Sequence, residues 1–183
     1  MERTGLQREA IESLVTAGAF DSLVGDRRAA LWEVGLRYRP VGEQQALDLP
    51  VEQDMAELPG LTEWEEMVGE YRTMGLYPGG HLMAKLRPSL DPGIVSSDEV
   101  PHLRDGEEVT VAGLVIRRQR PLAKAVFLTL EDEFGHTPVV VWPQTYERYR
   151  LVLREPLLKV RGKVSRREGT LNIVLTHAEA LQG

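Results

Sequence analysis

The chain contains no cysteine among its 183 residues. This absence excludes disulfide bonds, a thiol nucleophile and every cysteine-based zinc or iron–sulfur site. No apolar run is long enough to span a bilayer, and the first thirty residues lack the apolar core of a signal peptide. Histidine is scarce as well, with four residues scattered along the chain. These absences predict a cytoplasmic protein with no membrane partner and no metal site in this chain.

The formal net charge of -6 hides an uneven distribution of charge. Residues 1–98 carry 9 basic and 17 acidic side chains, a net charge of -8, whereas residues 99–183 carry 13 basic and 11 acidic ones, a net charge of +2. Nine of the carboxylates lie between Glu43 and Glu70, a segment without lysine or arginine. Local charge therefore indicates more about binding partners than the isoelectric point of the whole chain does.

Two short amphipathic helices are predicted near the N-terminus. Thr4 and Gln7 have the spacing of a capping box at the start of the first helix, which is expected to end near Gly18. Asp26 is a suitable N-cap for the second helix. The helical period predicts core positions at Leu6, Ala10, Ile11, Leu14 and Val15 in the first helix and at Ala30, Leu31 and Val34 in the second.

The segment AGAFDSLVG joins these two helices. A turn between two helices directs backbone N–H groups and a helix N-terminus outward, an arrangement that suits a phosphate. Gly18 lies in this turn and Arg27 and Arg28 follow it, so these three residues are candidates for contact with a nucleic-acid backbone. An ordinary helical hairpin explains the same residues, and the residues alone favour it because such helix pairs are common.

Residues 40–60 are predicted to form an acidic linker, since they are rich in proline and show little periodicity. Within the linker, Gln45, Leu47 and Leu49 are spaced as anchors for a groove on another protein. A loose likeness of QALDLP to clamp-binding peptides makes the sliding clamp the candidate partner, although Pro50 stands where those peptides end in an aromatic residue. The alternative, in which the leucines pack the linker against its own domain, is favoured.

A third helix is predicted to begin at Thr62, which forms a second capping-box pattern with Glu65, and to stop at Gly75. Its period predicts a core-facing stripe of Trp64, Met67, Val68, Tyr71 and Met74. The residues that follow are rich in turns, with a short helix after His81. A lone histidine beside glycines is expected to be structural, because neither a carboxylate pair nor a second histidine lies at ligand spacing.

From residue 99 onward the hydrophobic period changes from 3.6 to 2, which predicts five strands: Glu108–Arg118, Ala125–Asp132, Thr137–Trp142, Leu157–Ser165 and Thr170–Ala180. A helical segment bounded by Pro143 and Pro156 separates the third strand from the fourth. Gly113 and Gly162 are mid-strand glycines, which are typical of strands that bend to close a small barrel. The pattern predicts an α+β protein, with an N-terminal helical hairpin region followed by a five-stranded OB-fold β-barrel.

Basic residues gather in the two loops that grip the ligand in an OB-fold. They are Arg117, Arg118, Arg120 and Lys124 between the first two strands, and Arg166 and Arg167 between the last two. Phe127 and Trp142 are candidate stacking surfaces for bases, but strand alternation leaves open whether either ring faces the core. Solvated arginines, partly neutralised by Glu131, Asp132 and Glu133, are the alternative. Nucleic acid is favoured because both loops are basic.

Four stretches, taken in order, resemble the C-terminal region of bacterial DNA polymerase III alpha-type subunits, and most closely the error-prone branch. They are AGAFDSLVGDRRAALW, EYRTMGLYPGGHLMAKLR, VTVAGLVIRRQRPLAKAVFLTLEDEFGHTPVVVWPQTYERYR and LLKVRGKVSRREG. The resemblance covers nearly the whole chain, and the OB portion is its specific part. One departure is Leu82, since the family usually has a proline after the histidine.

The resemblance implies a helix-hairpin-helix module that contacts the duplex DNA backbone, and an OB domain near the single-stranded template. The parent would be an error-prone DNA polymerase that acts in translesion synthesis, at the boundary of DNA replication and DNA repair. The resemblance also strengthens the interpretation that the AGAFDSL turn binds a phosphate. The family holds Mg²⁺ with palm-domain aspartates that this sequence lacks. We therefore expect part of a longer polymerase, with no catalytic residues, no cofactor and no polymerase activity of its own.

The expected organisation is a helix-hairpin-helix region at residues 1–39, the acidic linker at 40–60, a helical connector at 61–98 and an OB-fold nucleic-acid-binding domain at 99–183. DNA binding is the favoured function. The alternative is an OB-fold protein-interaction module that docks a replication or repair partner, and salt dependence separates the two. An independent enzyme is the weakest hypothesis, because the sequence contains no nucleophile–base pair, Gly-rich phosphate loop or metal-ligand spacing.

Overall fold

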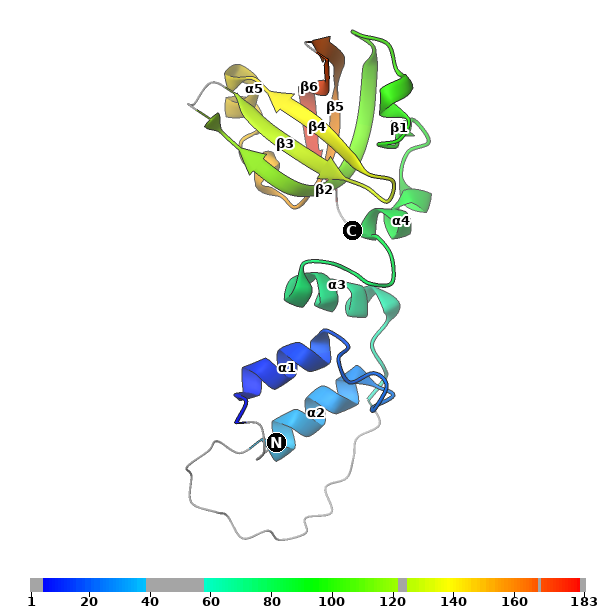
Figure 1. Cartoon of the computed structure of the whole chain (residues 1–183), viewed down its shortest axis with the longest axis vertical. Coiled ribbons are helices and arrows are strands. Elements are labelled where there is room, and N and C mark those ends of the chain that lie inside the picture. Colours follow the sequence, from blue (N-terminus) through cyan, green and yellow to red (C-terminus); the bar gives the residue numbers. More distant parts are fainter. Residues whose placement is uncertain (1–4, 39–57, 122–124, 168, 182–183) are drawn as a thin grey trace. The chain divides into compact units, whose positions relative to one another are not determined.

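The computed structural model describes residues 5–38, 58–121, 125–167 and 169–181 (Figure 1). The chain divides into two compact units, Met1–Gly79 and Gly80–Gly183. This division lies earlier than residue 99, where the change of hydrophobic period begins. In the structure, a short helix and a short strand between residues 80 and 98 both contact a strand of the barrel.

The described part of the first unit contains three α-helices: α1 (Arg8–Thr16), α2 (Arg27–Arg37) and α3 (Glu63–Met74). The predicted cap of α2 is confirmed, because the carboxylate of Asp26 accepts hydrogen bonds from the backbone amides of Arg28 and Ala29. The predicted start of α1 is wrong. Its N-cap is Gln7, which makes no side-chain capping bond, and Thr4 lies outside the described residues.

The small core between α1 and α2 is apolar and consists of Ile11, Val15, Ala30 and Val34. Leu31 is partly buried against it, as expected, and so is Phe20 from the connecting turn. Leu6, Ala10 and Leu14 are exposed, contrary to the predicted stripe. Helix α1 contacts α2 and α3 along only part of its surface, and these three positions lie beyond the covered strip.

The predicted capping box of α3 is confirmed. The hydroxyl of Thr62 accepts a hydrogen bond from the Glu65 amide at 3.2 Å, and the Glu65 carboxylate accepts one from the Thr62 amide at 2.8 Å. Gly75 ends the helix with a left-handed φ of 75°.

The predicted apolar stripe of α3 is mostly wrong. Met67 is buried, but Trp64, Val68 and Met74 are exposed. The second buried residue of this helix is Glu70, whose carboxylate lies 2.6 Å from the guanidinium of Arg27. An ion pair thus occupies the packed face of α3, where the apolar period had predicted hydrophobic contacts.

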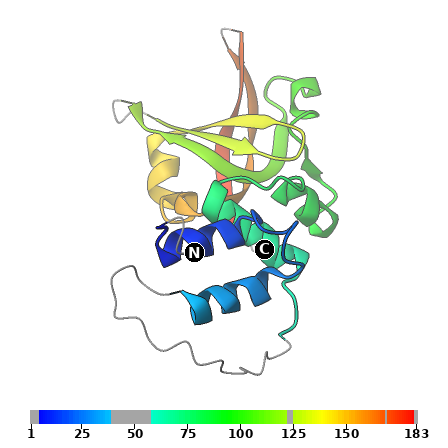
Figure 2. The same cartoon turned by 60° about the horizontal axis from the view of Figure 1, so that its bottom comes forward.

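The second unit is a β-barrel. Five strands build it: β2 (Glu108–Gln119), β3 (Val126–Glu131), β4 (His136–Val141), β5 (Leu157–Arg167) and β6 (Thr170–Ala180). Their hydrogen-bonded order is β2-β3-β4-β6-β5, and a β2–β5 pairing closes the circle. Only β4 and β6 pair in parallel within this circle. This is the strand order of an OB-fold, as predicted, and Figure 2 shows β5 and β6 as a long hairpin.

Two glycines allow the barrel to close. A Cβ on Gly113 would lie 2.7 Å from the carbonyl oxygen of Glu131, and one on Gly162 would overlap the backbone of Val174. The pairing of β5 with β6 shifts register between Arg161 and Gly162. Both mid-strand glycines therefore stand where a neighbouring strand approaches too closely for a side chain, and Gly162 also lies at an irregularity of the kind that the sequence predicted.

Inward-facing apolar side chains from all five strands form the core, which includes Val111, Leu128, Leu130, Val139, Val141, Leu158, Val160 and Ile173. Helix α5 (Pro143–Tyr149) and the 3₁₀ turn η4 (Val152–Arg154) connect β4 to β5, where the sequence predicted a helix. Both connect to the core, through Tyr149 and Leu153 respectively.

Four short elements precede the barrel strands: α4 (Leu82–Leu86), η1 (Arg87–Ser89), β1 (Ile94–Val95) and η2 (Val100–His102). Strand β1 adds to the sheet by pairing in parallel with β2. His81 has a structural role, as expected, because its Nδ1 accepts a hydrogen bond from the Met83 amide at 3.0 Å and caps α4. Leu82, the departure from the family pattern, is buried in the first turn of α4.

Candidate nucleic-acid interface

Phe127 points out of the barrel. It lies on β3 between Val126 and Leu128, which are buried, and its own side chain is 41% exposed. In the antiparallel β3–β4 pair it stands opposite Val140, so both side chains lie on the outer face of the sheet. The structure thus answers the question that strand alternation left open, and the ring is accessible to a ligand.

Trp142 is also accessible. It follows the last residue of β4, serves as the N-cap of α5 and is 53% exposed. Because residues two apart along an extended chain point to the same side, Trp142 continues the outer face on which Val140 lies. Pro143 begins α5, and the Tyr146 amide donates a hydrogen bond to the Trp142 carbonyl at 2.8 Å. Helix α5 therefore holds the backbone of Trp142 at the end of β4.

Strand β2 adds polar groups to this outer face. After a register shift between Val115 and Arg117, Arg117 stands opposite Thr129 and Gln119 stands opposite Phe127. With its amide oxygen turned toward the guanidinium, Gln119 accepts hydrogen bonds from Arg117 at 3.1 and 2.8 Å. An amide carries no net charge, so this partner leaves the positive charge of Arg117 in place, diagonally across from Phe127.

Arg120 is oriented by an aromatic ring. Its guanidinium lies over Tyr146 of α5, 4.7 Å from the ring centroid. This is a cation–π contact, which fixes the direction of the side chain while its N–H groups remain able to donate. Sequence reasoning missed Tyr146, although its position four residues after Trp142 on the predicted helix was a signal that could have found it.

Arg118 and Arg166 are directed toward backbone carbonyls. The guanidinium of Arg118 donates to the carbonyls of Leu153, Arg154 and Glu155 at 2.9, 3.0 and 2.6 Å. That of Arg166 donates to the carbonyl of Leu103 at 3.3 and 3.0 Å and to that of Pro101. The structure therefore separates these two cations from Arg117 and Arg120, which the sequence had grouped with them.

The remaining candidates of the two loops differ in how far the structure describes them. Arg167 is exposed at the end of β5. Lys124 lies outside the described residues, and so do the three candidate clamp-binding residues, Gln45, Leu47 and Leu49. Their proposed contacts stay predictions.

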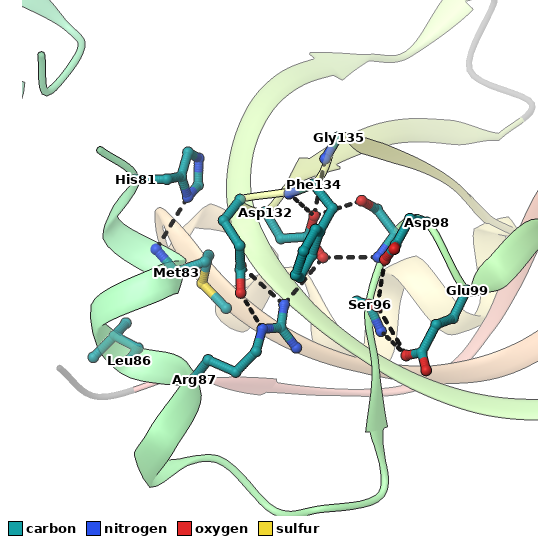
Figure 3. Close-up of polar contacts among 12 residues, drawn as sticks. His81, Met83, Leu86, Arg87, Ser96, Asp98, Glu99, Asp132, Phe134 and Gly135 are labelled. Atoms are coloured by element: carbon teal, nitrogen blue, oxygen red, sulfur yellow. Dashed lines mark hydrogen bonds and ion pairs between the residues drawn. The ribbon is translucent and has the colours of Figure 1, made fainter. Parts of the chain in front are cut away.

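The three carboxylates that could neutralise the basic loops are engaged elsewhere. Arg87 of η1 pairs with Glu133 and, at 3.2 Å, with Asp132 (Figure 3). Glu131 lies 3.0 Å from the ring nitrogen of His136 and 3.5 Å from that of His81. Arg87, from the segment before β1, therefore offsets part of the negative charge of these acids.

Asp132 is the centre of the polar cluster in Figure 3. Its buried carboxylate accepts hydrogen bonds from the amide of Ser97 at 2.8 Å and from the amides of Phe134 and Gly135 at 3.0 and 3.1 Å. Burial alone would raise the pKa of Asp132, but the hydrogen bonds from Ser97 and these amides outweigh it and hold the pKa below its usual value. The cluster fixes the β3–β4 hairpin to the segment that precedes β2.

In the first unit, Arg27 is held by two carboxylates. Its guanidinium lies 2.5 Å from Asp21 and 2.6 Å from Glu70, and its side chain is 10% exposed. The hydrogen bond with Asp21 is the main cause that raises the pKa of Arg27. Gly18 has a φ of 77°, and a Cβ there would overlap this guanidinium. Arg28 pairs with Glu65 at 3.0 Å. A phosphate contact by these residues stays a prediction.

The described residues contain no group of three or more histidine, aspartate or glutamate side chains placed to hold a metal ion. Among the same residues, no helix is long and apolar enough to cross a membrane.

Comparison with known proteins gives two findings. Residues 109–181 match the family described as an OB-fold nucleic acid binding domain. The whole chain is similar to several error-prone DNA polymerases. The polymerase of Mesorhizobium japonicum is 39% identical over 98% of this chain, that of Pseudomonas syringae pv. syringae is 40% identical over 94%, and polymerase 1 of Rhizobium meliloti is 36% identical over 97%. In each case the chain spans only 17% of the length of the relative.

Proposed function

This chain is homologous, over about 95% of its length, to the C-terminal 17% or so of error-prone DNA polymerases, and from that premise we propose that its OB barrel binds single-stranded DNA. The binding surface is the outer face of β3 and β4, bordered by the β2–β3 and β5–β6 loops. In a longer polymerase this surface would hold the single-stranded template during damage-tolerant synthesis. The helical hairpin would contact the duplex backbone, a role for which only the resemblance argues.

One observation carries the proposal: the aromatic rings of Phe127 and Trp142 are exposed on the same outer face. Large aromatic side chains are costly to leave in water and usually enter the core of a small barrel. Their flat faces can each stack on a base, which stabilises a single strand by about 1–3 kcal/mol per base, with little preference for sequence. Duplex DNA keeps its bases stacked on each other, so such a surface favours single strands.

Charge supports the same surface. Arg117 lies diagonally across from Phe127, and Arg120 lies over Tyr146 near Trp142. Cations beside stacking rings can neutralise the phosphates of a strand whose bases lie on those rings. Arg87 pairs with Glu133 and Asp132 of the β3–β4 hairpin and offsets part of the negative charge there.

The proposal is tested by substituting one exposed tryptophan at a time. Trp142→Ala is expected to weaken binding of a fluorescein-labelled oligothymidylate, measured by fluorescence anisotropy, by about 5- to 150-fold, the equivalent of one lost stack. Trp64→Ala is the matched control, because Trp64 is 39% exposed but lies on α3 in the other unit. Equal affinity of the Trp142 variant and the wild-type protein would instead support the protein-interaction module.

A further inference from the structure

Two pairs of adjacent arginines border the proposed surface, each at the end of the strand that leads into one of the two loops. Arg117 and Arg118 lie near the end of β2, and Arg166 and Arg167 lie at the end of β5. Adjacent residues of a strand point to opposite faces of the sheet, so the two arginines of a pair cannot contact the same ligand surface in the same way. Arg117 stands opposite Thr129 on the outer face, whereas Arg118 stands opposite Leu128, a core residue.

Arg118 ties the β2–β3 loop to the connection between α5 and β5. Its Nε donates to the Leu153 carbonyl, and one terminal nitrogen donates to the carbonyls of Arg154 and Glu155. These carbonyls lie at the end of the 3₁₀ turn η4, where the last C=O groups have no partner within the turn. A guanidinium, with several N–H donors in one plane, can satisfy all three at once.

Arg166 ties the β5–β6 loop to the segment before β2 in the same manner. Its guanidinium donates to the carbonyls of Pro101 and Leu103, at the end of the 3₁₀ turn η2. Its backbone amide donates to the carboxylate of Asp105 at 2.8 Å, which strengthens the same connection. Each of the two loops is therefore attached by one arginine to the end of a 3₁₀ turn.

We propose that Arg118 and Arg166 are positioning residues, which set the two loops at the border of the DNA surface, while Arg117 and Arg167 supply charge to phosphates. The inference rests on the proposed function, since it concerns the same surface. A positioning arginine acts through the shape and number of its donors. A phosphate contact depends in large part on charge, which lysine also carries, although lysine lacks the bidentate fork of arginine.

Substitution by lysine separates these roles, because it keeps the charge and removes the planar fork. Arg118→Lys and Arg166→Lys are each expected to weaken binding of the labelled oligothymidylate about three- to tenfold, as an unattached loop must be ordered on binding. The slope of log affinity against log salt concentration is expected to stay unchanged. Arg161→Lys is the matched control, because Arg161 is an exposed arginine of β5 that pairs with Glu108 outside the proposed surface, and it is expected to bind as the wild-type protein does.

Substitution by glutamine completes the test. Arg117→Gln and Arg167→Gln should each make the salt slope less steep by about 0.7, because one phosphate contact is lost. Thermal unfolding of each variant identifies those that fold, and the two loops test the inference independently if one lysine variant does not. Wild-type affinity of Arg118→Lys and Arg166→Lys would overturn the inference while the proposed function stands. Absence of single-strand binding by the wild-type protein would overturn both.

Discussion

Phe127 and Val140 face each other across the β3–β4 pair, on the side of the sheet opposite to the core residues Leu128 and Val139, with Phe127 41% exposed and Val140 9% exposed. The position of Phe127 determines how its truncation should affect DNA binding and the free energy of unfolding. Phe127→Ala is expected to weaken single-strand binding by about 1–3 kcal/mol. The free energy of unfolding should change little, because an exposed ring contributes little packing. Anisotropy titration and urea unfolding of the same preparation measure both quantities.

Leu128→Ala is the control for that prediction, since it changes the next residue along the strand. Leu128 is 2% exposed within the core, and its truncation is expected to cost about 2–5 kcal/mol of stability. If Phe127→Ala were as destabilising as Leu128→Ala, the ring would belong to the core, and the proposal that it stacks on a base would be wrong.

Gly18 is expected to stabilise the first unit, because no other residue fits its backbone conformation and surroundings as well. Its φ of 77° is costly for any residue with a Cβ, by about 1–2 kcal/mol, and a methyl group would also displace the guanidinium of Arg27 from beside it. Gly18→Ala should therefore lower the free energy of unfolding by at least that amount. Gly25→Ala should not, since Gly25 has an ordinary φ and open space at its Cβ. Similar unfolding curves for the two variants would contradict this packing.

Asp132 should make the barrel sensitive to acid. Its pKa is lowered in the folded protein, so its contribution to stability is present above the unfolded value, about 3.9, and is lost as the pH falls through the folded value. Asp132→Asn is expected to lower the free energy of unfolding by about 1–3 kcal/mol at pH 7, because an amide would place donors against the Ser97 amide. The difference between variant and wild type should shrink below about pH 4.

The control for this experiment is Asp91→Asn, at an exposed carboxylate 3.7 Å from Lys159. Its effect is expected to stay within about 0.5 kcal/mol. Urea unfolding at a series of pH values measures both variants. A deficit in the Asp132 variant that persisted unchanged at pH 3 would show that the hydrogen bonds do not depend on the ionised carboxylate.

Much of the barrel could be predicted from the sequence, because strand periodicity and mid-strand glycines are local signals. The five predicted strands agree with the structure to within two residues at every end. Gly113 and Gly162 stand where a neighbouring strand comes closest. The caps at Asp26 and Thr62 were predictable for the same reason, since each depends on a few consecutive residues.

The different orientations of neighbouring arginines could not be predicted from the sequence. Which of Arg117 and Arg118 faces outward depends on the register shift between Val115 and Arg117, and pairing between strands decides that shift. The ion pair between Arg27 and Glu70 could not be predicted either, because the two residues lie on α2 and α3 and are far apart in the sequence. A helical period identifies apolar positions but not how many neighbours cover them, which is why Trp64 was wrongly assigned to the core.

The chain alone is expected to extend no primer. Phosphoryl transfer needs metal-holding carboxylates and a site for the nucleoside triphosphate, and the sequence offers no motif for either. Purified protein incubated with primed template, Mg²⁺ and all four nucleotides should leave the primer at its original length on a sequencing gel. Extension that co-purifies with the protein through successive columns, and disappears from a preparation of a barrel-destabilised variant, would contradict this.

The salt dependence of single-strand binding tests the central claim most directly. Three cations of the described surface, Arg117, Arg120 and Arg167, should each release about 0.7 of a counterion, so log affinity is expected to fall against log salt concentration with a slope of about -2. Anisotropy of labelled oligothymidylate at a series of potassium chloride concentrations gives this slope. A flat response, or no binding at low salt, would contradict the account and leave the arginines as solvated side chains on a protein-binding barrel.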